Sequence, residues 1–420
     1  MIYIYQHIST PPLVEKFLLT NKTNYCMPAI APRRRKRKTK IQRPYWIGER
    51  AFPEFLRLRE QLRRRIGPKA LTQKEFNSLA LLEFARKSHS DAYPTKPEFP
   101  AWKPKFPATP TRRLKLPGFE NIKLLVKDES LNPTGTHKDR MAWETVVLEN
   151  TILRHKAAGK IAKVPQQSII SSGNTAVAIG EIRRRFGLPP VKVLVDNSMQ
   201  QQTIERIENH NVRVYATNLH SGALLNSDDI LRLTRNRNGI DLTRGRYALE
   251  LSKSYYDWMS FEILNQRPGI VIVPYGTGQL FDNISEHYEQ QIKAIKADPR
   301  LFAQRMREGG MHLVGVSAPL ESIADKLASP LIPESTKREF LQQKRNIVTQ
   351  KISAGVLGEL SRIEELEDKW FFEASRIALE HKITAEPSAL AGIAWLLKHK
   401  KLIPKGARVL IVNTGRGAIA

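Results

Sequence analysis

One lysine, Lys138, stands where the sequence turns from a strand into a helix. The apolar run 122–126 predicts a short buried strand, which Asn132, Pro133 and Gly135 end. The following twenty residues have helical periodicity, so Lys138 falls in the first turn, beside free backbone N–H groups and the positive end of the helix dipole. That field favours the neutral amine, which is the form that makes a Schiff base. A solvated surface lysine is the alternative that this segment leaves open.

Small polar residues fill the turn between a predicted strand end at 168–170 and an amphipathic helix at 175–186. Backbone N–H groups at a helix start, joined by hydroxyl groups, can bind an anion. Helix capping alone is the other interpretation, because the same residue types are preferred at caps. The residues of this turn are Ser171, Ser172, Gly173, Asn174 and Thr175.

A second turn of this kind follows the β-branched run 270–273, which predicts a parallel strand buried on both faces. Gly276, Thr277 and Gly278 come next, and the residues after them predict a helix. Glycines at this position allow backbone amides to approach a phosphate closely.

These turns belong to alternating strands and helices, a pattern typical of α/β proteins. The stretch 191–216 predicts a strand, a helix and a second strand, and the last predicted strand, 407–413, is followed by Thr414. We expect 217–246 to be a solvated loop and the charged stretch 363–381 to be an amphipathic helix. The loop would carry three acidic residues that are not at metal-ligand spacing, namely Asp228, Asp229 and Asp241.

Five segments resemble the fold-type II pyridoxal 5′-phosphate (PLP) enzymes, which include threonine synthase, cysteine synthase, serine/threonine dehydratase and the tryptophan synthase β chain. NPTGTHKDR around Lys138 is similar to the family's lysine segment, SSGNT to its asparagine loop, and the turn 276–278 to its phosphate loop. Glu386-Pro387-Ser388-Ala389 and the NTGRG at 413–417 complete the set, in the family's order, over about residues 108–420. The resemblance implies an α/β protein of two lobes, each a mostly parallel twisted sheet flanked by helices.

The resemblance also implies PLP as cofactor, and a role for each segment. Lys138 would carry PLP and act as the general base and acid, Asn174 would contact the phenolic oxygen, and Thr414 would face the ring nitrogen. Arg140 would be a candidate ligand of a substrate phosphate, with a structural ion pair as the alternative. The phosphate of PLP would be held by Gly276, Thr277, Gly278 and Gln279, and the substrate carboxylate by Ser171, Ser172, Gly173 and Thr175.

In one place the chain departs from the family pattern. Gln279 and Asn283 stand where the family commonly has glycine, which leaves open how many amides the phosphate loop directs at its anion.

The expected activity is PLP-dependent elimination or replacement at the β or γ carbon of an amino acid. The KDR sequence and Thr414 favour a threonine synthase-like reaction on O-phosphohomoserine. A cysteine or cysteate synthase-like replacement, or a serine/threonine dehydratase reaction, is the alternative. The non-enzyme alternative is a basic protein of the same fold that binds nucleic acid or a partner. We expect a large PLP-binding lobe at 46–140 and 246–420 and a small mobile lobe at 141–245.

Charge is the unusual feature of the composition. The 420 residues carry a formal net charge of +27, with seven of the positive charges in the run Arg33–Lys40 of a basic extension, 1–45. We expect this extension to be flexible. The alternative is that it binds polyanions non-specifically. The single cysteine, Cys26, excludes an intramolecular disulfide, and no apolar run approaches the length of a membrane span. We therefore expect a cytoplasmic protein without a metal site, and we also expect a homodimer.

Overall fold

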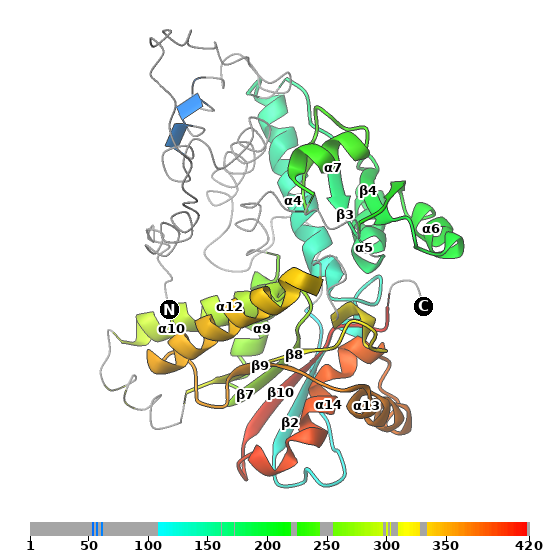
Figure 1. Ribbon diagram of the computed structural model, residues 1–420. Coiled ribbons are helices and arrows are strands. Elements are labelled where there is room, and N and C mark those ends of the chain that lie inside the picture. Colours follow the sequence, from blue (N-terminus) through cyan, green and yellow to red (C-terminus); the bar gives the residue numbers. More distant parts are fainter. Residues whose placement is uncertain are drawn as a thin grey trace, which may run out of the picture.

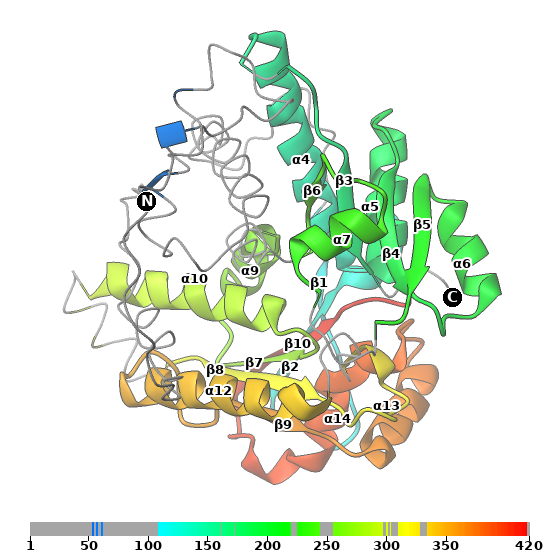
Figure 2. The ribbon, with the colours of Figure 1, turned by 45° about the horizontal axis from the view of Figure 1, so that its top comes forward.

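The computed structural model of the chain contains two β-sheets with helices packed against them (Figures 1 and 2). The structure describes residues 108–417 except 161, 172, 220–224, 244–254, 297–299, 301–302, 304–309 and 328–333, together with the isolated positions 53, 56, 57, 60 and 61. The basic extension 1–45, with the run Arg33–Lys40, lies outside the described residues.

Six strands form the larger sheet: β1 (Thr111–Arg113), β2 (Lys123–Asp128), β7 (Ile270–Pro274), β8 (His312–Ser317), β9 (Arg362–Glu365) and β10 (Arg408–Asn413). Their order is β1-β2-β10-β7-β8-β9, and every neighbouring pair is parallel except β1 with β2. The carboxyl ends of β2, β10 and β7 therefore meet at one edge. In open parallel sheets, ligands bind at this edge.

Helices cover both faces of the larger sheet, with α10 and α12 on one face and α13 and α14 on the other (Figure 1). The alternation of side chains along β7 explains this arrangement, because Val271 and Val273 share a core with α10 and α12, whereas Ile270 and Ile272 pack with α13 and α14. The helices of this part are α9 (Asp257–Leu264), α10 (Gln279–Ile295), α12 (Glu334–Ser353), α13 (Asp368–Glu380) and α14 (Ala391–Lys398). Short 3-10 turns are η2 (Glu129–Leu131), η3 (Asp325–Leu327), η4 (Pro387–Leu390) and η5 (Lys400–Leu402).

Four parallel strands form the smaller sheet, in the order β5-β4-β3-β6. They are β3 (Gln167–Ile170), β4 (Val191–Asp196), β5 (Val212–Thr217) and β6 (Ile240–Asp241). Helix α4 (Lys138–Ala157) begins beside the larger sheet and extends to the smaller one, where it packs against α5 (Asn174–Arg185) (Figure 1). The remaining helices of this part are α6 (Gln201–Glu208) and α7 (Ser227–Leu233).

Two local predictions were wrong. The stretch 217–246 is not simply a loop, because it contains α7 and the edge strand β6, where the buried Asp241 accepts a hydrogen bond from Ser227. Asn226 and Asp229 form a capping box that starts α7, so the acidic residues of this stretch serve local structure. The stretch 363–381 begins in strand β9, and helix α13 starts at Asp368.

The predicted α/β fold with two mostly parallel sheets is confirmed. All four strands of the smaller sheet fall between residues 141 and 245, and those of the larger sheet fall outside that range. The exact lobe boundaries and the mobility of the small lobe stay predictions. None of the helices in the described part of the chain is long and apolar enough to cross a membrane.

Candidate active site

The lysine turn is joined to the end of β10. Thr136 and Gly415 form an isolated bridge, the backbone N–H of His137 donates to the carbonyl oxygen of Thr414 at 2.8 Å, and that of Arg416 donates to Gly135 at 2.9 Å. Gly415 has φ +144°, and a Cβ atom there would lie 2.4 Å from the carbonyl oxygen of Gly135. Glycine is therefore required for this close approach, which places Lys138 beside Thr414.

Lys138 is the first residue of α4, as the sequence predicts. Its Nζ atom donates a hydrogen bond to the hydroxyl of Tyr256 at 3.0 Å. The ring of His137 stacks on Tyr256 with 5.4 Å between centroids. Burial and the neighbouring Lys138 lower the pKa of His137 to about 3, so the imidazole is neutral at physiological pH. Within the described residues, Lys138 has no carboxylate partner in an ion pair.

Asn174 connects the smaller sheet with this site. It is the first residue of α5, and its Nδ2 atom lies 3.4 Å from both carboxylate oxygens of Glu386. The backbone N–H of Glu386 in turn donates to Gly415 at 2.9 Å. Burial raises the pKa of Glu386 above its usual value. The structure thus brings together the lysine turn, the asparagine turn, the 386–389 turn and the end of β10.

The other residues of the asparagine turn are placed as follows. The Ser171 hydroxyl accepts hydrogen bonds from the backbone N–H groups of Gly173 at 3.2 Å and Ala176 at 3.0 Å, so it satisfies two donors at the start of α5. Gly173 is buried with φ +130°, and Thr175 is half-buried in the first helical turn. Ser172 lies outside the described residues.

The predicted phosphate loop follows β7 and ends at the start of α10. Gly276 and Thr277 are half-buried, and Gly278 caps α10 with φ +82°, where a Cβ atom would lie 2.6 Å from the Tyr275 hydroxyl. Gln279 is the first residue of α10. Because β7 and β10 are neighbours, this loop and Thr414 follow adjacent strand ends.

The side chain of Asn283 contacts helix α9. Its side chain is buried, donates to Asp257 at 2.8 Å and accepts from Ser260, which are both residues of α9. The asparagine at a position where the family commonly has glycine therefore ties α10 to α9.

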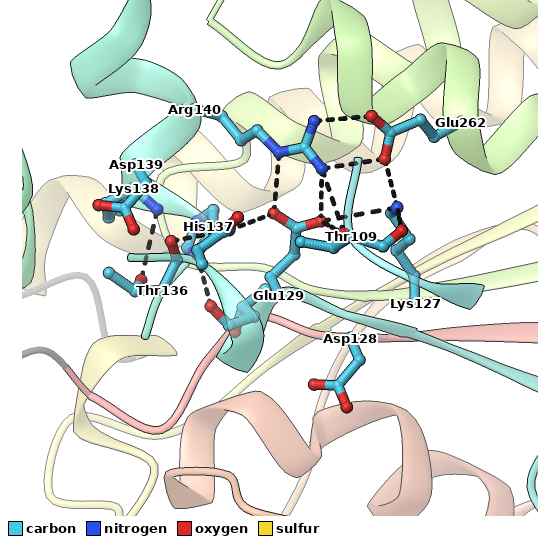
Figure 3. A network of polar contacts seen from close by, with 12 residues as sticks. Thr109, Lys127, Asp128, Glu129, Thr136, His137, Lys138, Asp139, Arg140 and Glu262 are labelled. Atoms are coloured by element: carbon cyan, nitrogen blue, oxygen red, sulfur yellow. Dashed lines mark hydrogen bonds and ion pairs between the residues drawn. The ribbon is translucent and has the colours of Figure 1, made fainter. Parts of the chain in front are cut away.

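Arg140 lies in a buried polar network rather than facing open space (Figure 3). Its guanidinium donates to Glu129 at 3.0 Å through both Nε and Nη2, to Glu262 at 2.8 and 2.9 Å, and to Thr109 at 3.1 Å. Lys127 also pairs with Glu262 (Figure 3). Although burial acts to raise the pKa of Glu129, its pKa lies below the usual value, chiefly because of Arg140. These contacts favour the structural alternative for Arg140.

Sequence reasoning missed several residues of this region, among them Tyr256 and Glu262. Both belong to a segment, 255–264, in which no motif or glycine turn stands out. Tyr256 contacts Lys138 across 118 positions, and Glu262 contacts Arg140 across 122. Such contacts leave no periodic signal in the sequence.

The residues present fit PLP on two structural observations. Lys138 is half-buried at the carboxyl edge of the larger sheet, and the hydroxyl-bearing Thr414 is buried beside the lysine turn, where its carbonyl oxygen accepts from His137. The start of a 17-residue helix, capped by a glycine in the left-handed conformation, follows the adjacent strand and suits a phosphate.

Comparisons with known proteins agree with this geometry. The chain is similar to the threonine synthases of Synechocystis sp. (27% identical over 309 residues, 71% of this chain and 72% of that one) and of Halalkalibacterium halodurans (25% over 307 residues, 70% and 78%). It shares the fold of O-ureido-L-serine synthase (TM-score 0.53, 18% identity, 75% of this chain and 90% of that one) and of maize serine racemase (TM-score 0.52, 15% identity, 80% and 93%). Residues 105–415 match the family described as pyridoxal-phosphate dependent enzyme. Since that match spans well over half of the sequence, the chain belongs to the pyridoxal-phosphate dependent enzyme family, and its cofactor is PLP.

Proposed function

We propose that the chain catalyses PLP-dependent elimination or replacement at the β or γ carbon of an amino acid, with O-phosphohomoserine as substrate and threonine as product. The observation that carries the proposal is the position of Lys138 against Thr414, with Asn174 and Glu386 beside them. Both relatives named above are threonine synthases, which favours this substrate over the alternatives. In the proposed reaction water enters the substrate and inorganic phosphate leaves it.

Each side chain of the site would have its own role in the reaction. When bound, PLP supplies the electron sink that makes the α-proton of an amino acid removable. Lys138 would take that proton and return protons later, as general base and acid. Thr414 would present a hydroxyl, rather than a carboxylate, to the ring nitrogen and so leave that nitrogen largely without a proton. Asn174 would hold the phenolic oxygen, and the start of α10 would bind the phosphate.

The cofactor part of the proposal has a direct test. Protein incubated with PLP should turn yellow, and borohydride should bleach the colour and fix the cofactor on Lys138, as peptide mass spectrometry would show. Lys138→Ala should give no fixed label. The matched control is Lys123→Ala, which removes an exposed lysine at the start of β2. Label spread over many lysines would contradict the assignment.

The substrate needs a separate test. The protein would be incubated with O-phosphohomoserine, O-phosphoserine, O-acetylserine, serine and threonine, with phosphate, acetate, ammonia and amino-acid products measured. We expect equal amounts of phosphate and threonine from O-phosphohomoserine. Phosphate without threonine would contradict the first choice, and turnover of a serine derivative or of free serine would favour the synthase-like or dehydratase alternatives.

A second candidate function, polyanion binding, is favoured by one cluster of cations in the smaller sheet. Lys192 and Arg213 are register partners on β4 and β5, so like charges stand side by side. Lys192 donates to the backbone oxygen of Arg235 at 2.6 Å, and burial together with Arg213 and Arg235 lowers the pKa of Lys192. Within the described residues, neither arginine has an ion-pair partner.

Salt elution from immobilised heparin tests this second function. We expect the double variant Arg213→Ser/Arg235→Ser to elute at lower salt than the unchanged protein, because it contacts fewer sulfate groups of heparin and so releases fewer counterions on binding. Arg232→Ser is the matched control, since Arg232 is exposed nearby but paired with Asp229 at 3.2 Å. Deleting residues 1–45 separates the contribution of the basic extension. Equal elution of the double variant and the control would remove the cluster as a binding surface.

A further inference from the structure

The hydroxyl of Tyr256 lies against the reacting nitrogen of the site. Lys138 Nζ donates to it at 3.0 Å and lies 5.7 Å from the centre of the same ring. Tyr256 is 1% exposed, and its ring stacks on His137. The imidazole of His137 is oriented by the end of β10, because its Nδ1 lies 3.1 Å from the carbonyl oxygen of Thr414. Among the described residues, the Tyr256 hydroxyl is the side-chain acceptor of the Lys138 amine.

Helix α9 holds Tyr256 rigidly, because it is tied to two other helices. Tyr256 is the N-cap of α9, and its carbonyl oxygen accepts from Ser260 at 2.8 Å. On one side Glu262 pairs with Arg140 of α4, two residues after Lys138 in the sequence. On the other side Asp257 accepts from Asn283 at 2.8 Å and contacts His287 at 2.7 Å, which are both in α10.

The two ties explain residues that the family pattern left unaccounted for. Arg140 links helix α4, which begins at Lys138, to helix α9, whose N-cap is Tyr256. Asn283, which stands in place of a glycine, fixes the start of α9. A site works only when its reacting groups are held by such supporting contacts. Both contacts therefore hold in place the helix starts at which Lys138 and Tyr256 lie.

We propose that Tyr256 is a further catalytic residue, whose hydroxyl accepts a hydrogen bond from the Lys138 amine and stabilises its protonated form. This inference rests on the proposed function for the identity of the reaction. When the α-carbon–hydrogen bond of the substrate breaks, the proton forms a new N–H bond on Lys138, and the ammonium donates to Tyr256. The tyrosine O–H bond stays intact, so the proton remains on the lysine until it is handed on.

The first test uses protein from which PLP has been removed, so that the Lys138 amine is free, and it needs no turnover. Tyr256→Phe keeps the ring against His137 and removes one oxygen atom. Lys138 would be labelled with acetic anhydride at fixed pH and quantified by peptide mass spectrometry. Because the variant loses an acceptor that favours the ammonium, we expect Lys138 to be labelled about three- to tenfold faster. Unchanged labelling in a variant with an unchanged melting temperature would overturn the proposal.

A neighbouring tyrosine supplies the matched control. Tyr255 is 2% exposed, and its hydroxyl has no hydrogen-bond partner among the described residues. Tyr255→Phe therefore removes the same atom from an adjacent buried ring and should leave the labelling rate of Lys138 unchanged. A rise equal to that of Tyr256→Phe would show a general loosening of α9 and would overturn the specific role.

The second test measures turnover on whichever amino acid the substrate panel identifies. We expect kcat of Tyr256→Phe to fall by about tenfold or more, with KM changed by less than about threefold, because the hydroxyl acts on the proton-carrying lysine and not on substrate binding. A rise in KM at constant kcat would contradict this. Should no amino acid be turned over, the proposed function fails while the labelling result still decides the role of Tyr256.

A second pair of variants covers the case in which Tyr256→Phe does not fold. Tyr256→Gln retains a carbonyl acceptor, whereas in Tyr256→Leu the side chain is somewhat shorter and has no acceptor. Slower labelling of Lys138 in the glutamine variant than in the leucine variant supports the proposal, and equal rates overturn it.

Discussion

Asn174, which follows a strand of the smaller sheet, contacts Glu386 in the part of the chain that contains the larger sheet. The amide nitrogen lies 3.4 Å from each carboxylate oxygen. Asn174 starts a helix of the smaller sheet, and Glu386 precedes η4 of the larger part and is hydrogen-bonded to Gly415. The contact therefore fixes the asparagine turn relative to the lysine turn, which is also joined to Gly415.

Removing this contact should weaken the binding of PLP. We expect Glu386→Ala to raise the dissociation constant about fivefold, the equivalent of one hydrogen bond worth about 1 kcal/mol. Glu386→Gln keeps an oxygen that can accept from Asn174 and should retain most of the affinity. Fluorescence titration with PLP measures both. Equal affinities of the alanine variant and the unchanged protein would show that the contact does not position Asn174.

Arg140 should be important for stability. Arg140→Met leaves Glu129, which is fully buried, without its main partner, and we expect the free energy of unfolding to fall by about 3–5 kcal/mol. Arg232→Met, at an exposed pair, should cost less than about 1 kcal/mol. Urea titration followed by circular dichroism gives both values. A variant of unchanged stability with a raised KM for O-phosphohomoserine would instead support the substrate-phosphate role.

Gly415 should tolerate no side chain. Gly415→Ala combines a backbone angle that favours glycine with a Cβ atom 2.4 Å from the Gly135 oxygen, so we expect a loss of more than about 2 kcal/mol of unfolding free energy. Gly406→Ala also has a positive φ, +78°, but nothing within 4 Å of the added atom, and should cost about 1 kcal/mol. The difference between the two variants measures the close approach of the chain segments together with the less accessible φ of Gly415, +144°. Equal losses would contradict the close approach of Gly415 to Gly135.

His137 should make stability depend on pH in the acid range. Its pKa in the folded protein is about 3, below the ordinary value of 6.5, so below pH 6.5 the unfolded chain binds a proton that the folded chain does not. Its contribution is therefore complete above pH 6.5 and is lost as the pH falls towards 3, by up to about 1.4 kcal/mol per pH unit. His137→Phe, which keeps a ring against Tyr256, should show a shallower decline between pH 7 and pH 5.

The exposed His381 is the control for this pH effect. His381→Phe should decline as the unchanged protein does, in urea titrations at pH 7 and pH 5. A His137→Phe variant whose stability falls as steeply as that of the unchanged protein would assign the acid sensitivity to other groups.

Local patterns predicted the elements that carry the site. The β-branched run at 270–273 became β7, the small-residue turn before Thr175 became the start of α5, and Lys138 begins α4. The errors arose where local signals conflict. Strand β9 is rich in charged residues, and α7 is short and begins with acidic capping residues, so each lacked the hydrophobic period expected of its class.

The sequence by itself determined the family, the order of the strand-end turns and the lysine that they surround, because these depend on neighbours within one turn or strand. The tertiary structure alone decided what Arg140 and Asn283 do, since either side chain could have faced a ligand and both instead hold α9 in place. It also placed Tyr256 on Lys138, a contact between segments 118 positions apart. Contacts of that range are set by the packing of helices on a sheet, and short stretches of sequence carry no record of them.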